Sequence, residues 1–314
     1  MTAERALPEP RVVSLLPSAT EIAVALGFGA HLVGRSHECD YPPAVGDLPR
    51  LTATKLQKGL SSVEIDRRVQ EIVRQGLSAY EVDAEQLRSL RPDVILTQTQ
   101  CAVCAVTPRD LDEALSAWTG AEPALISLAP DDLKDVWGDF AKVGAALGLD
   151  ADRVAAVVSG LQARLETLAA SVAHAPRPRV VAVEWIEPLM VAGNWVPELI
   201  GLAGGASLLA TPGQHSPWME WDALEAADPD VIVLMPCGFQ VPQTLEHMAP
   251  LADEPRWRAL RAVRDGRVAV ADGHHLFNRP GPRLVESAET LAEIFHPGLC
   301  DFGHRDRYWI PAPA

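Results

Sequence analysis

The sequence is short of cysteine, of basic residues and of long hydrophobic runs, and each shortage excludes a class of protein. Its 314 residues include only five cysteines, an odd number that favours reduced thiols over a framework of disulfides. Lys and Arg total 27 against 42 Asp and Glu, so the formal net charge is −15. A surface this acidic repels phosphate backbones, and we expect no nucleic-acid partner. No stretch approaches the roughly 20 apolar residues of a membrane span, which predicts no insertion into a membrane.

The N-terminus also lacks the pattern of a secretion signal. Residues 1–10 are polar and contain proline, and the first apolar segment, residues 11–16, is too short for the apolar core of a signal peptide. We therefore expect a cytoplasmic protein. A periplasmic or extracellular protein from which a signal has been removed is the alternative.

Motifs of nucleotide-dependent and nucleophilic enzymes are missing as well. No predicted strand is followed by G-x-G-x-x-G or by a P-loop, and no serine lies in a G-x-S-x-G elbow. The chain is therefore predicted not to be an enzyme.

The chain is composed of two related halves. Residues 11–16 (RVVSLL) recur as residues 179–184 (RVVAVE), and residues 90–96 (LRPDVIL) recur as residues 227–233 (ADPDVIV). Each Pro-Asp pair, followed by an apolar run, predicts a helix end, a turn and a buried parallel strand. Alternating strands and helices predict an α/β fold with two Rossmann-like lobes, each a parallel sheet with helices on both faces.

A long helical stretch separates the halves. Residues 131–147 predict one helix, and residues 151 to about 172 predict a second, whose apolar positions form one stripe. The second helix would span about 33 Å and connect the lobes. We assign residues 11–148 to an N-terminal α/β lobe, 149–175 to the connecting helix, 176–300 to a C-terminal α/β lobe and 301–314 to a C-terminal tail, with the ligand cleft between the lobes.

Ligands of open parallel sheets bind at the carboxyl ends of the strands, so the loops that follow the predicted strands hold the candidate residues. In the first half, Ser18 and Thr20 follow the first strand, and Ser18 with Glu21 also has the spacing of a helix capping box. The other candidates in this half are His37, Glu38, Tyr41, Gln98 and Gln100.

In the second half, the corresponding loops combine aromatic rings with amide, acidic or imidazole groups. Flat apolar walls with a few polar groups suit a large, planar, amphiphilic ligand. The candidates are Trp185, Asn194, Trp195, Gln214, His215, Trp218, Phe239, Asn278 and Arg279. His274 and His275 are adjacent, so on a strand their rings would face opposite ways and only one would reach the ligand.

Three cysteines offer an alternative site. Cys101 and Cys104 form a Cys-x-x-Cys pair, which suits a soft metal or a redox couple. Cys39 and His37, on a neighbouring loop, are the residues that would complete it. The alternative function is therefore a metal or iron–sulfur centre with a redox or enzymatic role, set against the reading of these cysteines as buried structural thiols.

These motifs together resemble the helical-backbone (class III) substrate-binding proteins of ABC transporters, in their cobalamin-binding branch. The resemblance covers residues 11–297. It rests on RVVSLLPSATE at 11–21, the Pro-Asp-Val-Ile strands at 92 and 229, residues 198–200 before a Gly-Gly pair, and the long connecting helix. It implies two α/β lobes and an ABC transporter as partner. Members of this family bind cobalamin, siderophores, haem or metal ions, and the segments 36–42 and 98–104 resemble a cytoplasmic offshoot.

The residues and the resemblance together predict non-catalytic binding of a corrinoid such as cobalamin, or of a similar large metal chelate. Trp185, Trp195, Trp218 and Phe239 would pack on the faces of the ligand, Gln98, Gln100, Asn194 and Gln214 would bond its edges, and His37 or His215 would approach the metal axially.

Overall fold

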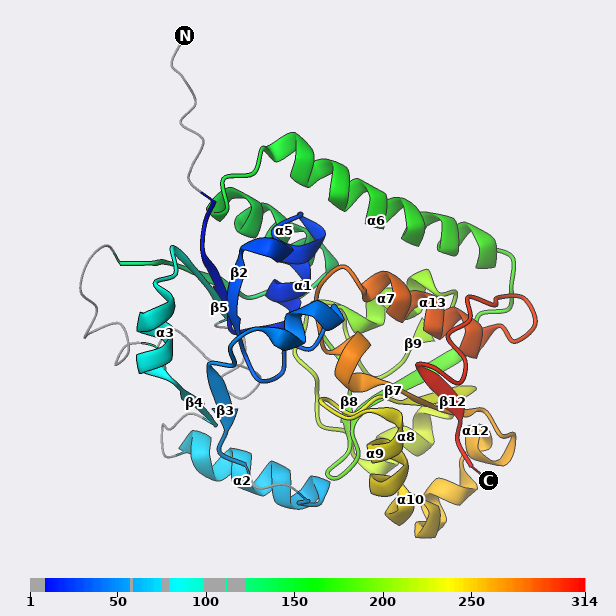
Figure 1. Cartoon of the computed structure of the whole chain (residues 1–314). Coiled ribbons are helices and arrows are strands. Elements are labelled where there is room, and N and C mark those ends of the chain that lie inside the picture. The colour runs from blue at the N-terminus through cyan, green and yellow to red at the C-terminus, as the bar shows by residue number, and fades with distance from the viewer. Residues whose placement is uncertain (1–8, 57–58, 75–78, 99–110, 112–121, 314) are drawn as a thin grey trace. The chain divides into compact units, whose positions relative to one another are not determined.

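The computed structural model describes residues 9–56, 59–74, 79–98, 111 and 122–313, and the chain divides into two compact units. Unit 1 holds residues 1–60, 64–130 and 134–159, and unit 2 holds residues 61–63, 131–133 and 160–314. Each unit contains a mainly parallel sheet with helices packed against it (Figure 1). The predicted α/β class with two Rossmann-like lobes is confirmed. The predicted lobe boundaries and the cleft stay predictions.

Unit 1 is built on a four-stranded parallel sheet in the order β2-β1-β5-β6. The strands of this unit are β1 (Val12–Ser14), β2 (Leu32–Arg35), β5 (Val94–Gln98) and β6 (Ala124–Leu128), with β3 (Thr52–Thr54) and β4 (Tyr80–Val82) as a separate antiparallel pair. The helices that lie mainly in it are α1 (Pro17–Ala25), α2 (Ser62–Arg74), α3 (Ala84–Leu90) and α5 (Leu133–Ala146), with 3-10 turns at Gly29–His31 and Pro43–Asp47. Its core centres on Val13, Leu15 and Ile95, which are almost completely buried.

Helix α1 begins differently from its prediction. Its N-cap residue is Leu16, no side chain caps it, and Pro17 occupies the first helical position. Proline is favoured there because its fixed φ suits a helix and its missing N–H is not needed. Ser18 and Glu21 therefore both lie inside the helix and are buried, so the predicted capping box is wrong.

Unit 2 is built on a sheet in the order β12-β11-β10-β7-β8, with β9 also paired to β7. Its strands are β7 (Arg179–Trp185), β8 (Met190–Val191), β9 (Ala206–Ser207), β10 (Val231–Leu234), β11 (Val268–Ala271) and β12 (Trp309–Pro311). Its helices are α7 (Val196–Leu202), α8 (Trp221–Ala227), α9 (Val241–His247), α10 (Ala249–Asp253), α11 (Pro255–Ala259), α12 (Arg261–Arg264) and α13 (Leu284–Phe295), with a π-helical turn at Gly273–Phe277. Strands β7, β10 and β11 are parallel, and β8 and β12 pair antiparallel with them.

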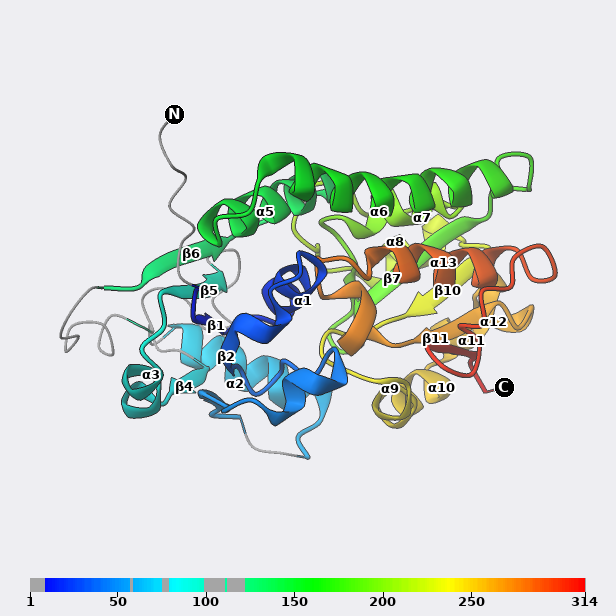
Figure 2. The same ribbon diagram turned by 45° about the horizontal axis from the view of Figure 1, so that its top comes forward.

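The central strands of unit 2 are buried on both faces. Every residue of β10 and β11 is buried. Val181 and Ile232 belong to a core cluster that includes residues of α8, α10, α11 and α12. Val180 points the other way and, with Phe295 of α13, borders Gly205. Helix α13 thus lies on one side of the strands, with α9 and α10 on the other (Figure 2). Two-sided burial is what continuous apolar runs predict for parallel strands.

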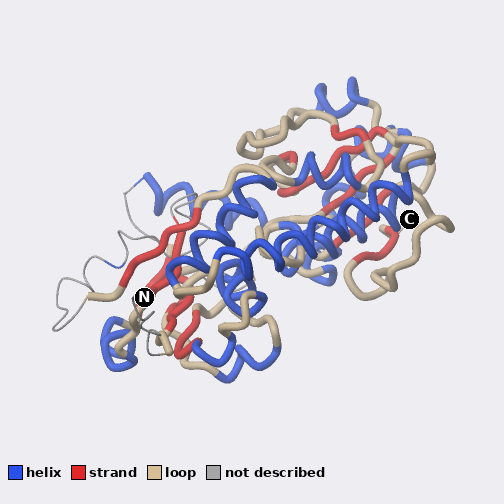
Figure 3. The backbone as a smooth tube through the Cα atoms, turned by 90° about the horizontal axis from the view of Figure 1, so that it is seen from above, coloured by secondary structure: helices blue, strands red, loops and turns tan. Residues whose placement is uncertain are grey.

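Helix α6 (Ala151–Val172) is the long helix that the sequence predicts, with the predicted start and end. It is the extended blue helix near the middle of Figure 3. Val154, Leu165, Leu168 and Val172 of its apolar stripe are buried. Within unit 2, Arg164 on this helix forms ion pairs with Glu286 (3.2 Å) and Glu289 (2.9 Å) of α13. Among the described residues, none of the helices combines the length and the apolarity needed to cross a bilayer.

The two copies of the repeated motif fold alike. In unit 1, Asp93 accepts a hydrogen bond from the backbone N–H of Arg11 (2.8 Å), and in unit 2 Asp230 accepts one from the backbone N–H of Arg179 (2.7 Å). The helix before each Pro-Asp pair ends on a left-handed residue, with φ of 45° and 38°. Strand β1 then pairs in parallel with β5, as β7 does with β10. The predicted duplication is therefore found in the hydrogen bonds of the structure as well as in the amino-acid sequence.

Candidate ligand-binding site

In unit 1, hydrogen bonds fix the loop after β2 at the carboxyl edge of the sheet. The backbone N–H of Ser36 donates to the carbonyl of Ser14, at the end of β1 (2.9 Å). The Arg35 guanidinium donates to the carbonyls of Ser36 and Cys39, at 3.0 Å each. The loop that carries His37 and Cys39 is therefore held by the end of β1 and by the side chain of Arg35.

Cys39 is fully buried in this loop. Its sulfur accepts a hydrogen bond from the Thr20 hydroxyl (3.1 Å) and lies 3.3 Å from the Ser36 hydroxyl. Thr20, which is also buried, therefore uses its hydroxyl inside the unit. Cys101 and Cys104 lie outside the described residues, so the metal or iron–sulfur site stays a prediction.

His37 is partly buried beside Thr52 and Tyr80. Its Nδ1 lies 2.7 Å from the Thr52 hydroxyl, and its ring centroid lies 5.6 Å from that of Tyr80. Burial, reinforced by the charges of Arg50 and Arg35, lowers the pKa of His37, so the ring is neutral at pH 7. A hydroxyl can donate or accept, so this contact does not fix which ring nitrogen carries the proton.

The other candidates of unit 1 differ in their exposure. Tyr41 exposes 38% of its surface, and Glu38 is partly exposed. Ser18 and Gln98 are buried, and Gln100 lies outside the described residues. Tyr41 is therefore the described candidate of this unit that a large ligand reaches most easily.

Unit 2 gathers aromatic candidates at the carboxyl ends of β7 and β10. Trp185 ends β7, Phe239 follows β10, and their ring centroids lie 5.3 Å apart at 51°. Both residues are mostly buried, whereas Trp218 exposes 54% of its surface. A backbone bridge to Met190 of β8 holds Trp218 at the sheet edge. Met190 is also the strand partner of Trp185, so Trp218 lies one strand beyond Trp185. An exposed flat ring at this edge is suited to stacking on a planar ligand.

Trp195 and Asn278 support the turn after β11. The indole N–H of Trp195 donates to the carbonyl of Phe277 (2.8 Å), and the ring is buried. The Asn278 amide donates to the carbonyl of Gly273 (2.7 Å). Both side chains therefore stabilise the backbone of the turn from within the unit.

A polar network joins two loops to Glu184 of β7. The Ser216 hydroxyl donates to the Glu184 carboxylate (2.8 Å) and accepts from the backbone N–H of Gly193 (3.0 Å). The backbone N–H of Asn194 donates to the carbonyl of Gln214 (2.7 Å). Burial raises the pKa of Glu184, and the hydrogen bond from Ser216 opposes that rise. The network fixes the loops that carry the predicted amide side chains.

The turn after β11 brings His274 and His275 together. Their ring centroids lie 4.6 Å apart, so the prediction that they face opposite ways is wrong. The reason is that the chain leaves the extended conformation and forms a π-helical turn, Gly273–Phe277, of a kind that is frequent at functional sites. Gly273 is required there, because a Cβ would lie 2.2 Å from the carbonyl oxygen of Pro236.

Each histidine of the turn has a charged partner. Asp272 accepts hydrogen bonds from both the backbone N–H (2.8 Å) and the Nδ1 (2.7 Å) of His275. Arg279 donates to the Nε2 of His274 (2.9 Å), and Arg283 donates to the carbonyl of His275. The sequence analysis identified Arg279 but neither Asp272 nor Arg283.

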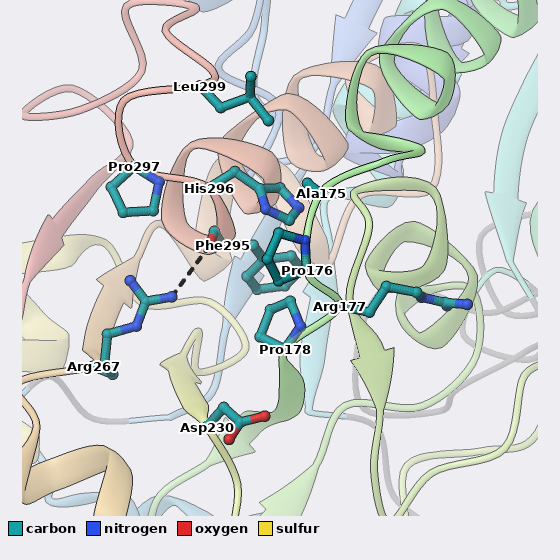
Figure 4. Close-up of a pocket in the computed structure, with 10 residues that line it drawn as sticks. All are labelled: Ala175, Pro176, Arg177, Pro178, Asp230, Arg267, Phe295, His296, Pro297 and Leu299. Carbon is teal, nitrogen blue, oxygen red and sulfur yellow. Dashed lines mark hydrogen bonds between the residues drawn. The ribbon is translucent and has the colours of Figure 1, made fainter.

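A cavity of about 430 Å³ lies at the opposite, amino end of the unit 2 sheet (Figure 4). Residues 175–178, which lead into β7, and residues 295–297 and 299, at and after the end of α13, form its walls. Arg267, next to β11, donates to the carbonyl of Phe295 (3.2 Å). Ligands of open parallel sheets bind outside the carboxyl ends of the strands, so the carboxyl edge and not this cavity is the candidate site.

Both α/β units carry aromatic and polar groups at the carboxyl ends of their strands, the edge at which open parallel sheets bind ligands. The sequence profile of the family described as Periplasmic binding protein matches residues 12–274, and the chain belongs to that family. The resemblance to class III substrate-binding proteins of the cobalamin-binding branch is confirmed, as is the prediction of a non-enzymatic role.

Two relatives in sequence span nearly the whole chain. The Vitamin B12-binding protein of Vibrio cholerae serotype O1 is 24% identical over 296 residues, which cover 90% of this chain and 88% of that protein. The ABC transporter substrate-binding lipoprotein YvrC of Bacillus subtilis is 24% identical over 300 residues, which cover 92% of this chain and 81% of that protein.

Solved structures give the same result for the fold. A periplasmic heme-binding protein from Pseudomonas aeruginosa is 25% identical with a TM-score of 0.67, over 93% of this chain and 94% of that chain. The periplasmic vitamin B12-binding protein BtuF of Vibrio cholerae is 22% identical with a TM-score of 0.62, over 92% of this chain and 97% of that chain. The expected cytoplasmic location gains no support from these relatives, which are named as periplasmic proteins or as a lipoprotein.

Proposed function

We propose that the chain binds a large metal chelate, either a corrinoid such as cobalamin or a haem, for an ABC transporter. The observation that carries the proposal is the exposed ring of Trp218, whose backbone bridges Met190, the strand partner of Trp185 in the packed pair with Phe239. Flat rings with a few hydrogen-bonding groups suit a planar ligand with a polar rim. The relatives named for vitamin B12 and for heme support a ligand of this class.

The remaining candidates provide the polar contacts in this proposal. In unit 2 the exposed or partly exposed groups at the carboxyl edge are Asn194, Gln214 and His215. In unit 1 the exposed or partly exposed candidates are His37, Glu38 and Tyr41, whereas the candidate Gln98 is buried. Corrin amides and haem propionates are the ligand groups that such side chains would bond.

The test of ligand binding is a calorimetric titration of the purified protein with cyanocobalamin and with hemin. We expect saturable binding of one of them with a dissociation constant in the micromolar range or below, on the order of −8 kcal/mol. Trp218→Ala should weaken it at least about tenfold, because the ring is exposed for stacking. Phe302→Ala removes an exposed ring of the C-terminal segment and should leave the affinity unchanged. Absence of saturable binding to either chelate would contradict the proposal.

We include the transporter because a relative that spans most of this chain is named an ABC transporter substrate-binding lipoprotein. The ligand-loaded protein should stimulate ATP hydrolysis by its cognate transporter in liposomes. Equal hydrolysis with and without the loaded protein would remove this part of the proposal.

A further inference from the structure

We propose that the cavity at the amino end of the unit 2 sheet is a second binding site, which takes a small aromatic carboxylate (Figure 4). This inference goes beyond the proposed function, because the cavity lies at the other end of the strands and shares no residue with the chelate candidates. Its volume of about 430 Å³ falls within the range of small-molecule sites, which is roughly 300–1,000 Å³.

Arg267, directly before β11, is the positive charge of the cavity. Its guanidinium donates to the carbonyl of Phe295 (3.2 Å), and within the part of the chain that the structure describes no carboxylate forms an ion pair with it. Figure 4 shows the guanidinium directed toward the wall that Phe295 and Pro178 form. An arginine is always charged and has five N–H donors, so one bond to a carbonyl leaves donors for a ligand.

The nearest acidic wall residue, Asp230, is already paired. One of its oxygens lies 2.6 Å from the guanidinium of Arg261, and the other accepts from the backbone N–H of Arg179 (2.7 Å). These contacts lower the pKa of Asp230, so its carboxylate is ionised and engaged at neutral pH. The charge of Arg267 therefore has no counterpart in the wall. A cleft with charge of one sign concentrates ions of the opposite sign, which favours an anionic ligand.

The other polar wall residues add no further charge inside the cavity. The guanidinium of Arg177 points away from the other labelled residues in Figure 4 and donates to the carbonyl of Gly205 (2.8 Å). The Nε2 of His296 lies 3.0 Å from the carbonyl of Ala203, which can only accept, so Nε2 carries a proton. Burial lowers the pKa of His296, and the charge of Arg267 adds to this effect, so the ring is neutral at pH 7. One anionic group is enough to balance the cavity.

The remaining wall is apolar and offers few donors. Three of its residues are prolines, which have no backbone N–H: Pro176, Pro178 and Pro297. The backbone N–H of Leu299 is used by the carbonyl of His296 (3.0 Å), and that of Arg267 by the carbonyl of Ala262 (2.7 Å). A ligand is therefore recognised by one guanidinium and by contact with flat apolar rings. This combination favours an anion with an aromatic body over a bare ion such as phosphate.

The test is a titration of the purified protein with 1-naphthoate, followed by NMR of the ligand. We expect saturable binding with a dissociation constant of about 1 mM or below. Two comparison probes separate the charge from the ring. Inorganic phosphate has the charge without the ring, and 1-naphthalenemethanol has the ring without the charge. Each should bind at least about tenfold more weakly than 1-naphthoate.

Arg267→Gln tests the charged contact and should weaken the binding of 1-naphthoate at least about tenfold. The matched variant Arg264→Gln, at an exposed arginine of α12 outside the cavity, should leave it unchanged. Leu299→Ala tests the apolar wall at a residue that is 58% exposed, so the fold should tolerate it, and should weaken binding about threefold. Phe302→Ala, at an exposed ring outside the cavity, is its control and should have no effect.

Each contrary outcome overturns the inference. These outcomes are the absence of saturable 1-naphthoate binding, an equal loss in Arg267→Gln and Arg264→Gln, and binding of either comparison probe as tight as that of 1-naphthoate. Loss of 1-naphthoate binding in Trp218→Ala, with no loss in Arg267→Gln, would place the probe at the carboxyl edge and has the same consequence. None of these measurements uses a chelate, so a failure of the proposed function and a failure of this inference are distinguishable.

Discussion

Glu293 of α13 is a buried carboxylate whose N–H donors come from the C-terminal segment. The backbone N–H groups of Phe302 (2.5 Å) and His304 (3.1 Å) donate to one oxygen, and the indole N–H of Trp309 donates to the other (2.7 Å). A buried charge is tolerated only with such partners. This one side chain therefore attaches residues 302–309 to the body of unit 2.

Glu293→Gln should destabilise the protein. The amide keeps one acceptor oxygen but directs N–H groups at donors, and we expect a loss of about 2 kcal/mol in the free energy of unfolding, measured in urea. Glu166→Gln, at an exposed position of α6, is the control and should change it by less than about 0.5 kcal/mol. Equal effects of the two variants would show that the contacts of Glu293 are not stabilising.

Asp139 of α5 is a buried carboxyl, and the partner of one of its oxygens is the exposed ammonium group of Lys142. One of its oxygens lies 2.8 Å from the ammonium of Lys142, and within the described residues the other has no hydrogen-bond partner. Burial raises the pKa of Asp139, against the opposing effect of Lys142. The folded state therefore retains a proton that the unfolded state releases. Stability falls as the pH rises from the ordinary carboxyl range through the raised pKa.

Asp139→Asn removes this dependence on pH. The melting temperature of the variant, relative to that of the wild-type protein, should be higher at pH 8 than at pH 5. For Glu166→Gln the difference from wild type should be the same at both pH values, because that carboxyl is exposed. An advantage of Asp139→Asn that shrinks as the pH rises would contradict the assigned direction.

Single residues were predictable where their role depends on local sequence. The two Pro-Asp pairs are examples, since strands β5 and β10 begin directly after them, as the motif predicts. Trp195 was not, because its partner, the carbonyl of Phe277, is 82 residues away. The role of Asp272 was hidden by the assumption that His275 continues a strand, although their spacing of three is that of a helical start.

At the scale of elements, α7 ends in a tight left-handed turn that only glycine fills easily. Gly204 has φ +81°, and a Cβ on it would lie 2.6 Å from Nε2 of His296 and 2.9 Å from a methyl of Val172 in α6. Gly201, within α7, has open space around it. The same substitution at these two positions should therefore have opposite effects.

Gly204→Ala should destabilise the protein by about 1–3 kcal/mol, through strain at positive φ and overpacking. Gly201→Ala should stabilise it by up to about 1 kcal/mol, because alanine is the better helix former. Thermal unfolding of the two variants measures both effects. A loss of stability in both, or in neither, would contradict the packing described for the end of α7.

Elements were predictable in proportion to the regularity of their sequence. Helix α6 was predicted from end to end because its stripe is periodic and prolines follow it. The turn Gly273–Phe277 was not predicted, because a single π-helical turn has no repeating pattern. The start of α1 was predicted wrongly. Serine is a common N-cap residue, which made Ser18 the predicted cap, but Pro17 occupies the first helical position.

At the scale of the whole molecule, a duplicated α/β unit explains why the candidate residues could be found at all. Topology places the loops after parallel strands at one edge of each sheet, so the candidates follow from the order of strands alone. The exposure of each candidate side chain does not follow from the order of the strands. Trp218 is open while Trp185 and Trp195 are buried, because burial depends on contacts between segments far apart in the sequence.

The central claim is that the chelate binds at the carboxyl edge of the unit 2 sheet, and hydrogen–deuterium exchange with and without ligand tests it most directly. With saturating hemin or cobalamin, we predict slower exchange in residues 184–187, 214–219 and 272–279. Residues 175–178, 295–297 and 299, which line the cavity at the amino end, should exchange as before. Protection of the amino-end residues, with none at the carboxyl edge, would contradict the account.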